Sequence, residues 1–368
     1  MNIKHSILGF LIFTLIGQTA WAGRAPLRTV AAEPYASAFV LDADTGETLF
    51  AKNADAQVYP ASTLKLMVLL VILERIEAGT LQLDEMVQVT VEAYKMGGSQ
   101  VYLDPKEQFP LEELLYALMI QSANDAAVAL ASHVAGTKEA FVELMNRKAQ
   151  ELGMKNTRFS SVHGLPPSNG QQVDVTTARD FGILCQNLSK RPEVYKYTGT
   201  KVRDFRGGEF IMRTHNHLLE NVDGCDGFKT GYFSKAGFSI AATAKRNGVR
   251  LIAIVMGSKN RKVRDAKATE LLNRGFAKVP ARQKTAPHAV TKTVTTEQKK
   301  ITTLSTSQKE NTPSLGSPQK EVNTINDSSG SGWLKFFMGI GVGLLLYAAF
   351  DFSRIRRRGT GNRRIRKY

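Results

Sequence analysis

The sequence predicts a mixed α/β domain of the α+β type, in which an antiparallel sheet is flanked by helices and a helical subdomain is inserted. Residues 36–51 alternate on both sides of a turn at Asp44-Thr45-Gly46, as in a β-hairpin. Residues 237–257 hold two apolar strands joined at Asn247-Gly248, a strong hairpin signal. Because strands open and close this region and helical periodicity fills its middle, we expect one sheet built from both ends of the domain.

The helices are predicted from the spacing of apolar residues. An uninterrupted apolar run follows Pro60, and we expect it to form a helix buried in the core. The other predicted helices are residues 111–134, 138–152, 174–188, which has a threonine cap near its start, and 264–277, which follows the last strand.

Charge is distributed unevenly along the chain. The 368 residues carry a formal net charge of +16, and 43% of them are hydrophobic. Residues 354–368 contain seven arginines and one lysine without an acidic residue, and residues 277–332 are also basic. Residues 23–276 are nearly neutral, so the positive charge describes a tail and a linker. It gives no reason to expect a nucleic-acid partner.

The first 22 residues are typical of a secretory signal peptide. Lys4 precedes an apolar run, and Ala20-Trp21-Ala22 fits the small-x-small rule for cleavage after Ala22. An uncleaved membrane anchor is the alternative interpretation. Export would permit a disulfide between Cys185 and Cys225, but two cysteines do not make a framework, and buried free thiols are an equal alternative.

The C-terminal part predicts a tethered domain. Residues 277–332 have the polar composition of a disordered linker. Residues 333–353 approach the length of a membrane-spanning helix, although an interfacial helix or a short core helix is an alternative. By the positive-inside rule the basic tail, 354–368, stays in the cytoplasm. We therefore expect a single-pass protein of the inner (cytoplasmic) membrane, with residues 23–276 as its catalytic domain on the extracytoplasmic, periplasmic side.

Ser62 and Lys65 form an S-x-x-K pair at the start of the buried helix. Their spacing places both side chains on one helix face. Serine needs a base to become a nucleophile, and burial lowers the pKa of a lysine so that it can act as that base. The motif alone is weak evidence, because a solvated lysine at a helix start is common.

Two further motifs favour the catalytic interpretation. Ser122-Ala123-Asn124 lies before or within a predicted helix, and Lys229-Thr230-Gly231 lies on a predicted strand just before the second hairpin. In this order the three motifs match the signature of penicillin-binding proteins and serine β-lactamases.

The resemblance extends beyond these boxes. Over residues 34–276 the chain resembles the low-molecular-mass penicillin-binding proteins, the D-alanyl-D-alanine carboxypeptidases, and shares with them "DADTGETLFAKN", "GSQVYLDPKE", "SVHGL", "TTARD" and "DGFKTGY". The resemblance implies a β-lactamase/transpeptidase-like fold. It also implies that the substrates are peptidoglycan stem peptides of the cell wall and that β-lactams are inhibitors. It implies no cofactor and no metal.

The resemblance also implies roles for individual residues. Ser62 would attack the carbonyl between the two terminal D-alanines, Lys65 would be its general base, and Ser122 would relay a proton to the leaving D-alanine. The remaining residues would bind substrate: Asn124 would hold the peptide and orient the lysine, Lys229, Thr230 and Gly231 would form the third box, and Tyr232 would join the oxyanion hole of backbone N–H groups. Arg264 matches a family arginine near the cleft, and a plain surface arginine is its alternative.

The chain departs from the family pattern at several positions. Leu64 stands where threonine is frequent. The arginine that contacts the substrate carboxylate in some relatives has no assigned counterpart, since "RTHNHLLE" offers only His215 or Asn216. His215 and His217 lack the clustered carboxylates or cysteines of a metal site. The polar linker follows where many relatives have a second, β-rich domain.

Four activities remain to be compared. A D,D-endopeptidase that cuts cross-links would need the same nucleophile as a carboxypeptidase. A β-lactamase of class A needs a glutamate in an E-x-x-L-N motif between the second and third boxes, and this chain has none there. A protein that binds wall peptides without cutting them would not need all three boxes. The sequence therefore favours a carboxypeptidase.

Overall fold

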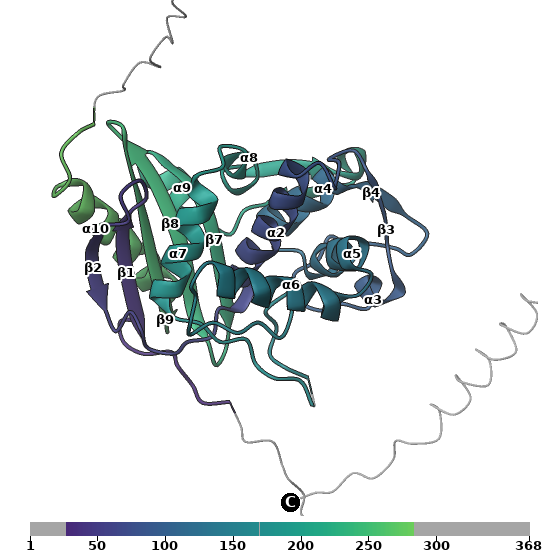
Figure 1. Ribbon diagram of the computed structural model, residues 1–368, viewed down its shortest axis with the longest axis horizontal. Coiled ribbons are helices and arrows are strands. Elements are labelled where there is room, and N and C mark those ends of the chain that lie inside the picture. Colours follow the sequence, from purple (N-terminus) through teal and green to yellow (C-terminus); the bar gives the residue numbers. More distant parts are fainter. Residues whose placement is uncertain (1–26, 169, 283–368) are drawn as a thin grey trace, which may run out of the picture. The chain divides into compact units, whose positions relative to one another are not determined.

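The computed structural model describes residues 27–168 and 170–282, and it contains the predicted antiparallel sheet (Figure 1). The sheet has five strands in the order β2-β1-β9-β8-β7. The first hairpin pairs with the last strand, which confirms that the sheet is built from both ends of the domain. The bounds are β1 (Ser37–Asp42), β2 (Thr48–Lys52), β7 (Cys225–Phe233), β8 (Gly237–Arg246) and β9 (Val249–Ser258).

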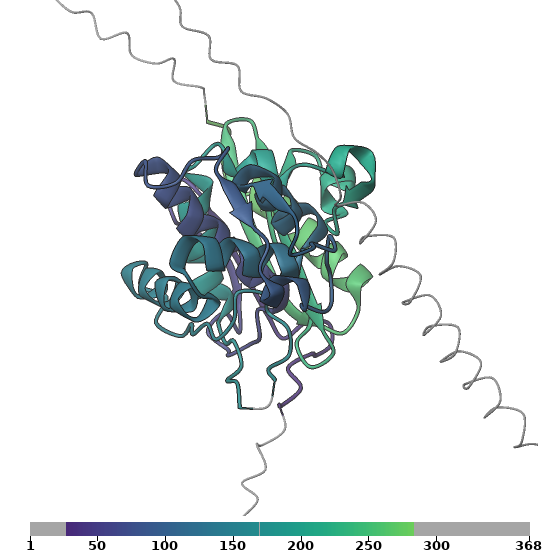
Figure 2. The ribbon, with the colours of Figure 1, turned by 90° about the vertical axis from the view of Figure 1, so that its right-hand side faces the viewer.

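Both faces of the sheet are buried because successive residues of a strand point to opposite sides. In β1, Phe39 and Leu41 belong to one core cluster and Ala38 and Val40 to another. The first cluster includes residues of α7 (Ala178–Ser189), and the second includes residues of α10 (Arg261–Phe276). The sheet thus separates α10, which shares its cluster with Leu218, from α7 and the helical region; Figure 2 shows the domain from a second side.

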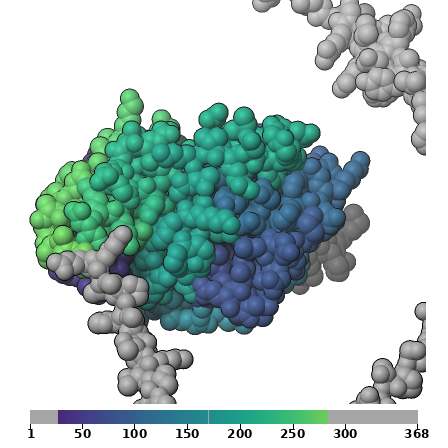
Figure 3. Space-filling view, turned by 90° about the horizontal axis from the view of Figure 1, so that it is seen from above, coloured from purple at the N-terminus to yellow at the C-terminus, as the bar shows by residue number. Residues whose placement is uncertain are grey.

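The helical region is organised around α2 (Lys65–Glu77), which follows the 3₁₀ turn η2 (Ala61–Leu64). Residues 65–73 of α2 are all buried, as predicted from the apolar run. In the space-filling view, residues of this region lie at one end of the domain and the C-terminal strands and α10, in green, at the other (Figure 3). The surrounding helices are α3 (Val91–Tyr94), α4 (Leu111–Tyr116), α5 (Asn124–Ala135), α6 (Lys138–Glu151), α8 (Val194–Thr198) and α9 (Leu218–Asn221).

The prediction of one continuous helix over residues 111–134 is wrong. The chain forms α4, then the π-helical turn η3 (Ala117–Gln121), and then α5. Ser122 separates them in the left-handed conformation, with φ of 60° and ψ of 31°. The apolar spacing continues through the break because both segments bury the same side, so periodicity cannot reveal it. Non-glycine residues in this conformation are strained and concentrate at functional sites.

Other elements differ in extent or were not predicted. The helix expected at 174–188 begins at Ala178, because Thr177 caps it by accepting a hydrogen bond from the backbone N–H of Asp180. Two small antiparallel sheets of two strands each were not predicted, because their strands have only three or four residues. They are formed by β3 (Met86–Gln88) with β4 (Gln108–Pro110) and by β5 (Val202–Phe205), the turn η4 (Arg206–Gly208) and β6 (Phe210–Arg213).

Several predictions concern the ends of the chain. The signal peptide, residues 333–353 and the tail 354–368 lie outside the described residues, as does the linker beyond residue 282. Within the described part of the chain, no helix is long and apolar enough to cross a membrane. Cys185 and Cys225 are both free thiols.

The contact between α7 and β1 yields a prediction about stability. A Cβ on Gly182 would lie 2.7 Å from two ring atoms of Phe39. The better helix propensity of alanine would stabilise by about 1 kcal/mol, whereas overpacking of a core costs about 1–3 kcal/mol. We expect Gly182→Ala to lower the free energy of unfolding by up to about 2 kcal/mol in urea titrations.

The partner variant Phe39→Leu provides the control for this prediction. Leucine removes the ring atoms that the new methyl group would meet, so the double variant should lose less stability than the sum of the two single variants. Strict additivity would show that the methyl group and the ring do not collide.

Candidate active site

The turn η2 brings Ser62 and Lys65 together. Side chains three residues apart eclipse each other in a 3₁₀ turn, and Lys65 Nζ lies 3.2 Å from Ser62 Oγ. Ser62 is partly exposed, whereas Lys65 is fully buried at the start of α2. A solvated lysine at a helix start, the alternative raised by the sequence, is therefore excluded.

The surroundings of Lys65 favour its neutral form. Burial is the main reason why its pKa falls well below 10.5, and the charge of Lys229 adds to the effect, while Asp125 and Asp174 oppose it. Besides Ser62, the amine contacts Asn124 Oδ1 at 2.7 Å and the backbone oxygen of His163 at 2.8 Å. A neutral amine has two N–H groups for these two acceptors, which leaves its lone pair for the hydroxyl proton of Ser62.

The break between η3 and α5 positions the second box. Ser122 and Asn124 are both buried, on either side of the point where α5 begins. The Asn124 side chain donates to the backbone oxygen of Gly97 at 2.7 Å, and its backbone N–H donates to Ser99 at 2.8 Å. The amide is therefore held with its oxygen toward Lys65. A continuous helix would point residues 122 and 124 to different sides, whereas the break lets Ser122 line the catalytic cleft while Asn124 contacts Lys65.

The third box lies on β7, directly against the turn that carries the nucleophile. A Cβ on Gly231 would lie 2.8 Å from the backbone oxygen of Pro60 and 3.0 Å from the backbone nitrogen of Ser62. Only glycine permits this approach, which brings the backbone of β7 beside the backbone N–H of Ser62. The next residue, Tyr232, is exposed and stacks on Phe238 with ring centroids 4.1 Å apart.

Lys229 is buried behind the strand and donates to the backbone oxygen of Thr230 at 3.1 Å. Burial, reinforced by the charge of Arg264, lowers its pKa to about 7. Arg264 itself is only 2% exposed, so it is not the surface arginine considered above. Its guanidinium donates to Asp265 at 2.6 and 2.8 Å and to the backbone oxygen of Ser239 at 3.3 Å.

These elements enclose a cleft of about 250 Å³. Predicted site residues that line it are Ser62, Ser122, Thr230, Gly231, Tyr232 and Arg264. Lys65, Asn124 and Lys229 are buried among the same elements without lining the cleft. The lining also contains Ser99, His215, Phe238 and Arg261, to which the sequence analysis assigned no role. Among the described residues, no three histidine, cysteine or carboxylate side chains gather as a metal site would require.

The chain matches one known protein family over most of its described part. The family of D-alanyl-D-alanine carboxypeptidases, peptidase family S11, matches residues 24–260. This chain belongs to that family.

Individual relatives agree with the family assignment. The D-alanyl-D-alanine carboxypeptidase DacF of Bacillus subtilis is 35% identical over 74% of this chain and 69% of its own length, and DacA of Escherichia coli is 36% identical over 65% and 60%. The chain thus spans roughly two thirds of these relatives. A D-alanyl-D-alanine endopeptidase of Pseudomonas aeruginosa is 34% identical over 59% of this chain and 70% of its own length.

A solved structure gives the same fold. Penicillin-binding protein D2 of Listeria monocytogenes, in its ampicillin-bound form, has a TM-score of 0.60 and is 31% identical. The match covers 66% of this chain and 98% of that one.

One further part of this S11 site was not foreseen from the sequence. The loop Ser160–Gly164 supplies the His163 oxygen to Lys65, and it also packs against the nucleophile, since a Cβ on Gly164 would lie 2.2 Å from the backbone oxygen of Ala61. The "SVHGL" motif in this loop supported the resemblance, but nothing in its composition says that a backbone oxygen is the functional atom.

Asp174 holds this loop from behind. Its carboxylate accepts from the backbone N–H of Ser160 at 2.6 Å, from that of Ser161 at 2.9 Å and from the Ser161 hydroxyl at 2.7 Å. The Ser161 hydroxyl in turn accepts from the backbone N–H of Gly164 at 2.9 Å. Asp174 is therefore a positioning residue that acts on Lys65 through His163.

Removal of the Asp174 carboxylate should slow acylation of the protein by penicillin. Asp174→Ala leaves two backbone N–H groups without an acceptor, so the loop and its oxygen shift, and we expect a loss of about 10- to 100-fold in the second-order rate constant. Asp174→Asn keeps one acceptor and can donate to Ser161, so it should lose less than about threefold. Wild-type rates in the alanine variant would refute the positioning role, and the exposed Asp84→Ala serves as the matched control.

The pH dependence of stability provides a second readout of Asp174. Burial raises its pKa to about 6, above the value of 3.8 for a free aspartate. The native state therefore binds this proton more tightly than the unfolded state, and the contribution of the group to stability falls as pH rises from about 4 to about 6. The wild type should lose stability relative to Asp174→Asn over that interval. A constant difference would show that Asp174 titrates normally.

Proposed function

We propose that this protein is a serine D-alanyl-D-alanine carboxypeptidase, which removes the terminal D-alanine from peptidoglycan stem peptides. The observation that carries the proposal is the contact of Ser62 Oγ with the buried amine of Lys65, whose remaining partners are both acceptors. Such an amine can take the serine proton, which is the step that makes serine a nucleophile. Membership in family S11 supports the same reaction.

The chemistry follows from the positions of these groups. Ser62 Oγ attacks the carbonyl carbon between the last two residues while its proton passes to Lys65 Nζ. The backbone N–H groups of Ser62 and Tyr232 bind the oxyanion of the tetrahedral intermediate. The C–N bond then breaks, and the leaving D-alanine takes up the proton through Ser122. Water hydrolyses the acyl-enzyme by the same route in reverse and restores Ser62.

The carboxylate of the terminal D-alanine is received by the cationic wall of the cleft. Thr230 offers a hydroxyl there, Arg264 lines the same wall, and Lys229 is buried next to Thr230. His215 and Arg261 line the same cleft, and Arg261 is exposed. Burial lowers the pKa of His215 and favours its neutral form, so the charge of the cleft comes from the guanidinium groups of Arg261 and Arg264, which favour an anionic end group. This arrangement suits an exopeptidase, which must recognise a free carboxyl terminus.

Penicillin labelling tests the acyl-enzyme directly. The ampicillin-bound relative supports the proposal that β-lactams acylate Ser62. Incubation of the purified protein with a fluorescent penicillin should label the wild type, and Ser62→Ala should remove the label completely, since among the described residues no other hydroxyl forms a hydrogen bond with Lys65. Ser189→Ala, remote from the cleft, should label normally. Labelling of the Ser62 variant would contradict the proposed nucleophile.

A D,D-endopeptidase is the second candidate, because the chain also matches the endopeptidase of Pseudomonas aeruginosa. The two activities differ in what they accept after the scissile bond. Incubation with a pentapeptide monomer and with a cross-linked dimer separates them. Release of free D-alanine from the monomer supports the carboxypeptidase, and cleavage of the dimer without release of D-alanine supports the endopeptidase.

The proposed location is the outer side of the cytoplasmic membrane. It is supported by the signal-like residues 1–22, the apolar residues 333–353 and the basic tail 354–368. The linker 277–332 would span roughly 40 Å as a flexible coil and so let the domain reach wall peptides. The protein isolated from bacterial membranes should begin at Gly23, and deletion of residues 333–353 should release it into the soluble fraction. Retention of the truncated protein in the membrane would contradict the anchor.

A further inference from the structure

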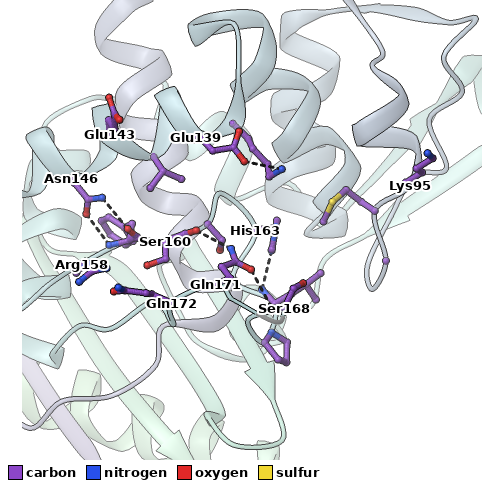
Figure 4. A pocket seen from close by; sticks show the side chains of 18 residues that line it. Lys95, Glu139, Glu143, Asn146, Arg158, Ser160, His163, Ser168, Gln171 and Gln172 are labelled. Atoms are coloured by element: carbon purple, nitrogen blue, oxygen red, sulfur yellow. Dashed lines mark hydrogen bonds and ion pairs between the residues drawn. The ribbon is translucent and has the colours of Figure 1, made fainter. Parts of the chain in front are cut away.

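A groove of about 830 Å³ lies beside the catalytic residues (Figure 4). Helix α6 forms one wall with Glu139, Glu143 and Asn146, and the segment that contains Arg158, Ser160 and His163 forms the opposite wall. Residues 95–97 close one end. The groove is larger than the catalytic cleft, and none of its lining residues is a member of the three boxes.

The groove and the catalytic cleft are neighbours. Ser99 lines the cleft and Gly97 lines the groove. Gly98 between them is so close to both that a Cβ there would lie 2.8 Å from Asn124 Nδ2 and 3.1 Å from a methyl carbon of Leu165. His163 faces the groove while its backbone oxygen accepts from Lys65. The two hollows therefore border one short segment, residues 97–99, so that one extended ligand can occupy both.

The frame of the groove is fixed by internal hydrogen bonds. Asn146 both donates to the backbone oxygen of Phe159 and accepts from its N–H, at 2.9 and 2.8 Å. Gln171 donates to the backbone oxygen of Ser160 at 2.9 Å. Lys138 forms ion pairs with Glu92 and Glu139. These polar groups already have partners, and the Asn146 pair joins the two walls directly.

Other charges in the groove have no such partner. Glu143 on α6 and Arg158 on the opposite wall are both exposed, and neither forms an ion pair with any residue in the ranges 27–168 and 170–282. Lys95 at the end of the groove is likewise exposed and unpaired there. The groove thus offers one anionic and two cationic groups to a ligand.

We propose that this groove binds the part of the stem peptide that precedes the scissile bond, with a peptide carboxylate at Arg158 and a peptide ammonium group at Glu143. This inference rests on the proposed function. The cleft, at about 250 Å³, is smaller than a typical ligand site of about 300–1,000 Å³. It has room for the D-alanyl-D-alanine end alone, and the cations that would face the terminal carboxylate line the cleft and not the groove.

The ligand class follows from the charges. A peptide with only neutral side chains would gain nothing from Glu143 and Arg158, whereas a stem peptide carries an acidic residue and a diamino acid ahead of its terminal D-alanines. Contacts between partly exposed charges contribute about 0.2–1 kcal/mol each. Each contact therefore changes KM by at most about fivefold, and kcat, which depends on Lys65 and Ser62, stays unchanged.

The experiment compares variants on matched peptides. The substrates are N-acetyl-L-Ala-γ-D-Glu-L-Lys-D-Ala-D-Ala, in which the lysine side chain is the one free amine, the same peptide with an acetylated lysine side chain, and diacetyl-L-Lys-D-Ala-D-Ala, which lacks both upstream charges. Arg158→Gln should raise KM about three- to fivefold for both pentapeptides and leave the short peptide unaffected. Glu143→Gln should raise KM only for the pentapeptide with the free amine. Arg147→Gln, an exposed change on α6 outside the groove, should alter none of them.

The outcomes separate the groove from the proposed function. If every variant hydrolyses the pentapeptides with the wild-type KM, or if KM rises equally for the short peptide, the groove does not bind the upstream residues. The carboxypeptidase function would still stand. If the wild type releases no D-alanine from any of the three peptides, the proposed function fails and the inference fails with it. Arg261→Gln, in the cleft, should weaken all three substrates alike.

Discussion

The site depends on one buried amine. Lys65 Nζ has no contact with solvent and is surrounded by the oxygen of Asn124, the backbone oxygen of His163 and the hydroxyl of Ser62. A charged ammonium group is costly in such a place, and Lys229 nearby raises the cost further. The same burial that makes the residue unusual in a core helix favours its unprotonated form, and only in that form can the amine accept a proton from the serine.

The fold excludes water from this amine and fixes its orientation. Three separate segments reach it: the turn η2 with α2, the break between η3 and α5, and the loop Ser160–Gly164 held by Asp174. Gly164 and Gly231 have no Cβ, so the backbones of the loop and of strand β7 can pack directly against the backbone of the turn that carries Ser62. The apolar residues that follow Lys65 in α2 fix the lysine itself, because every residue from 66 to 73 is buried.

The sequence predicts this architecture to a large extent and the site only in part. The sheet, the core helix and the three boxes could be predicted because each has a local signature in the sequence. These signatures are hairpin turns for the sheet, an apolar run for the helix, and short motifs for the boxes. The break at Ser122 could not, since the apolar pattern runs through it. The roles of His163 and Asp174 were also missed, because a backbone oxygen has no signature in the side-chain sequence and Asp174 acts through folded contacts. The groove between α6 and the Arg158 segment arises from packing of segments that are not adjacent in the sequence.

The pH dependence of acylation by penicillin tests the role of Lys65 most directly. The second-order rate constant should be measured between about pH 5 and pH 11, on the wild type and on Asp174→Asn. If burial keeps Lys65 neutral, the rate should rise and reach its plateau well below pH 10.5, the ordinary pKa of a lysine. A rate that keeps rising until about pH 10.5 would show that Lys65 titrates as a solvated lysine and would contradict the account.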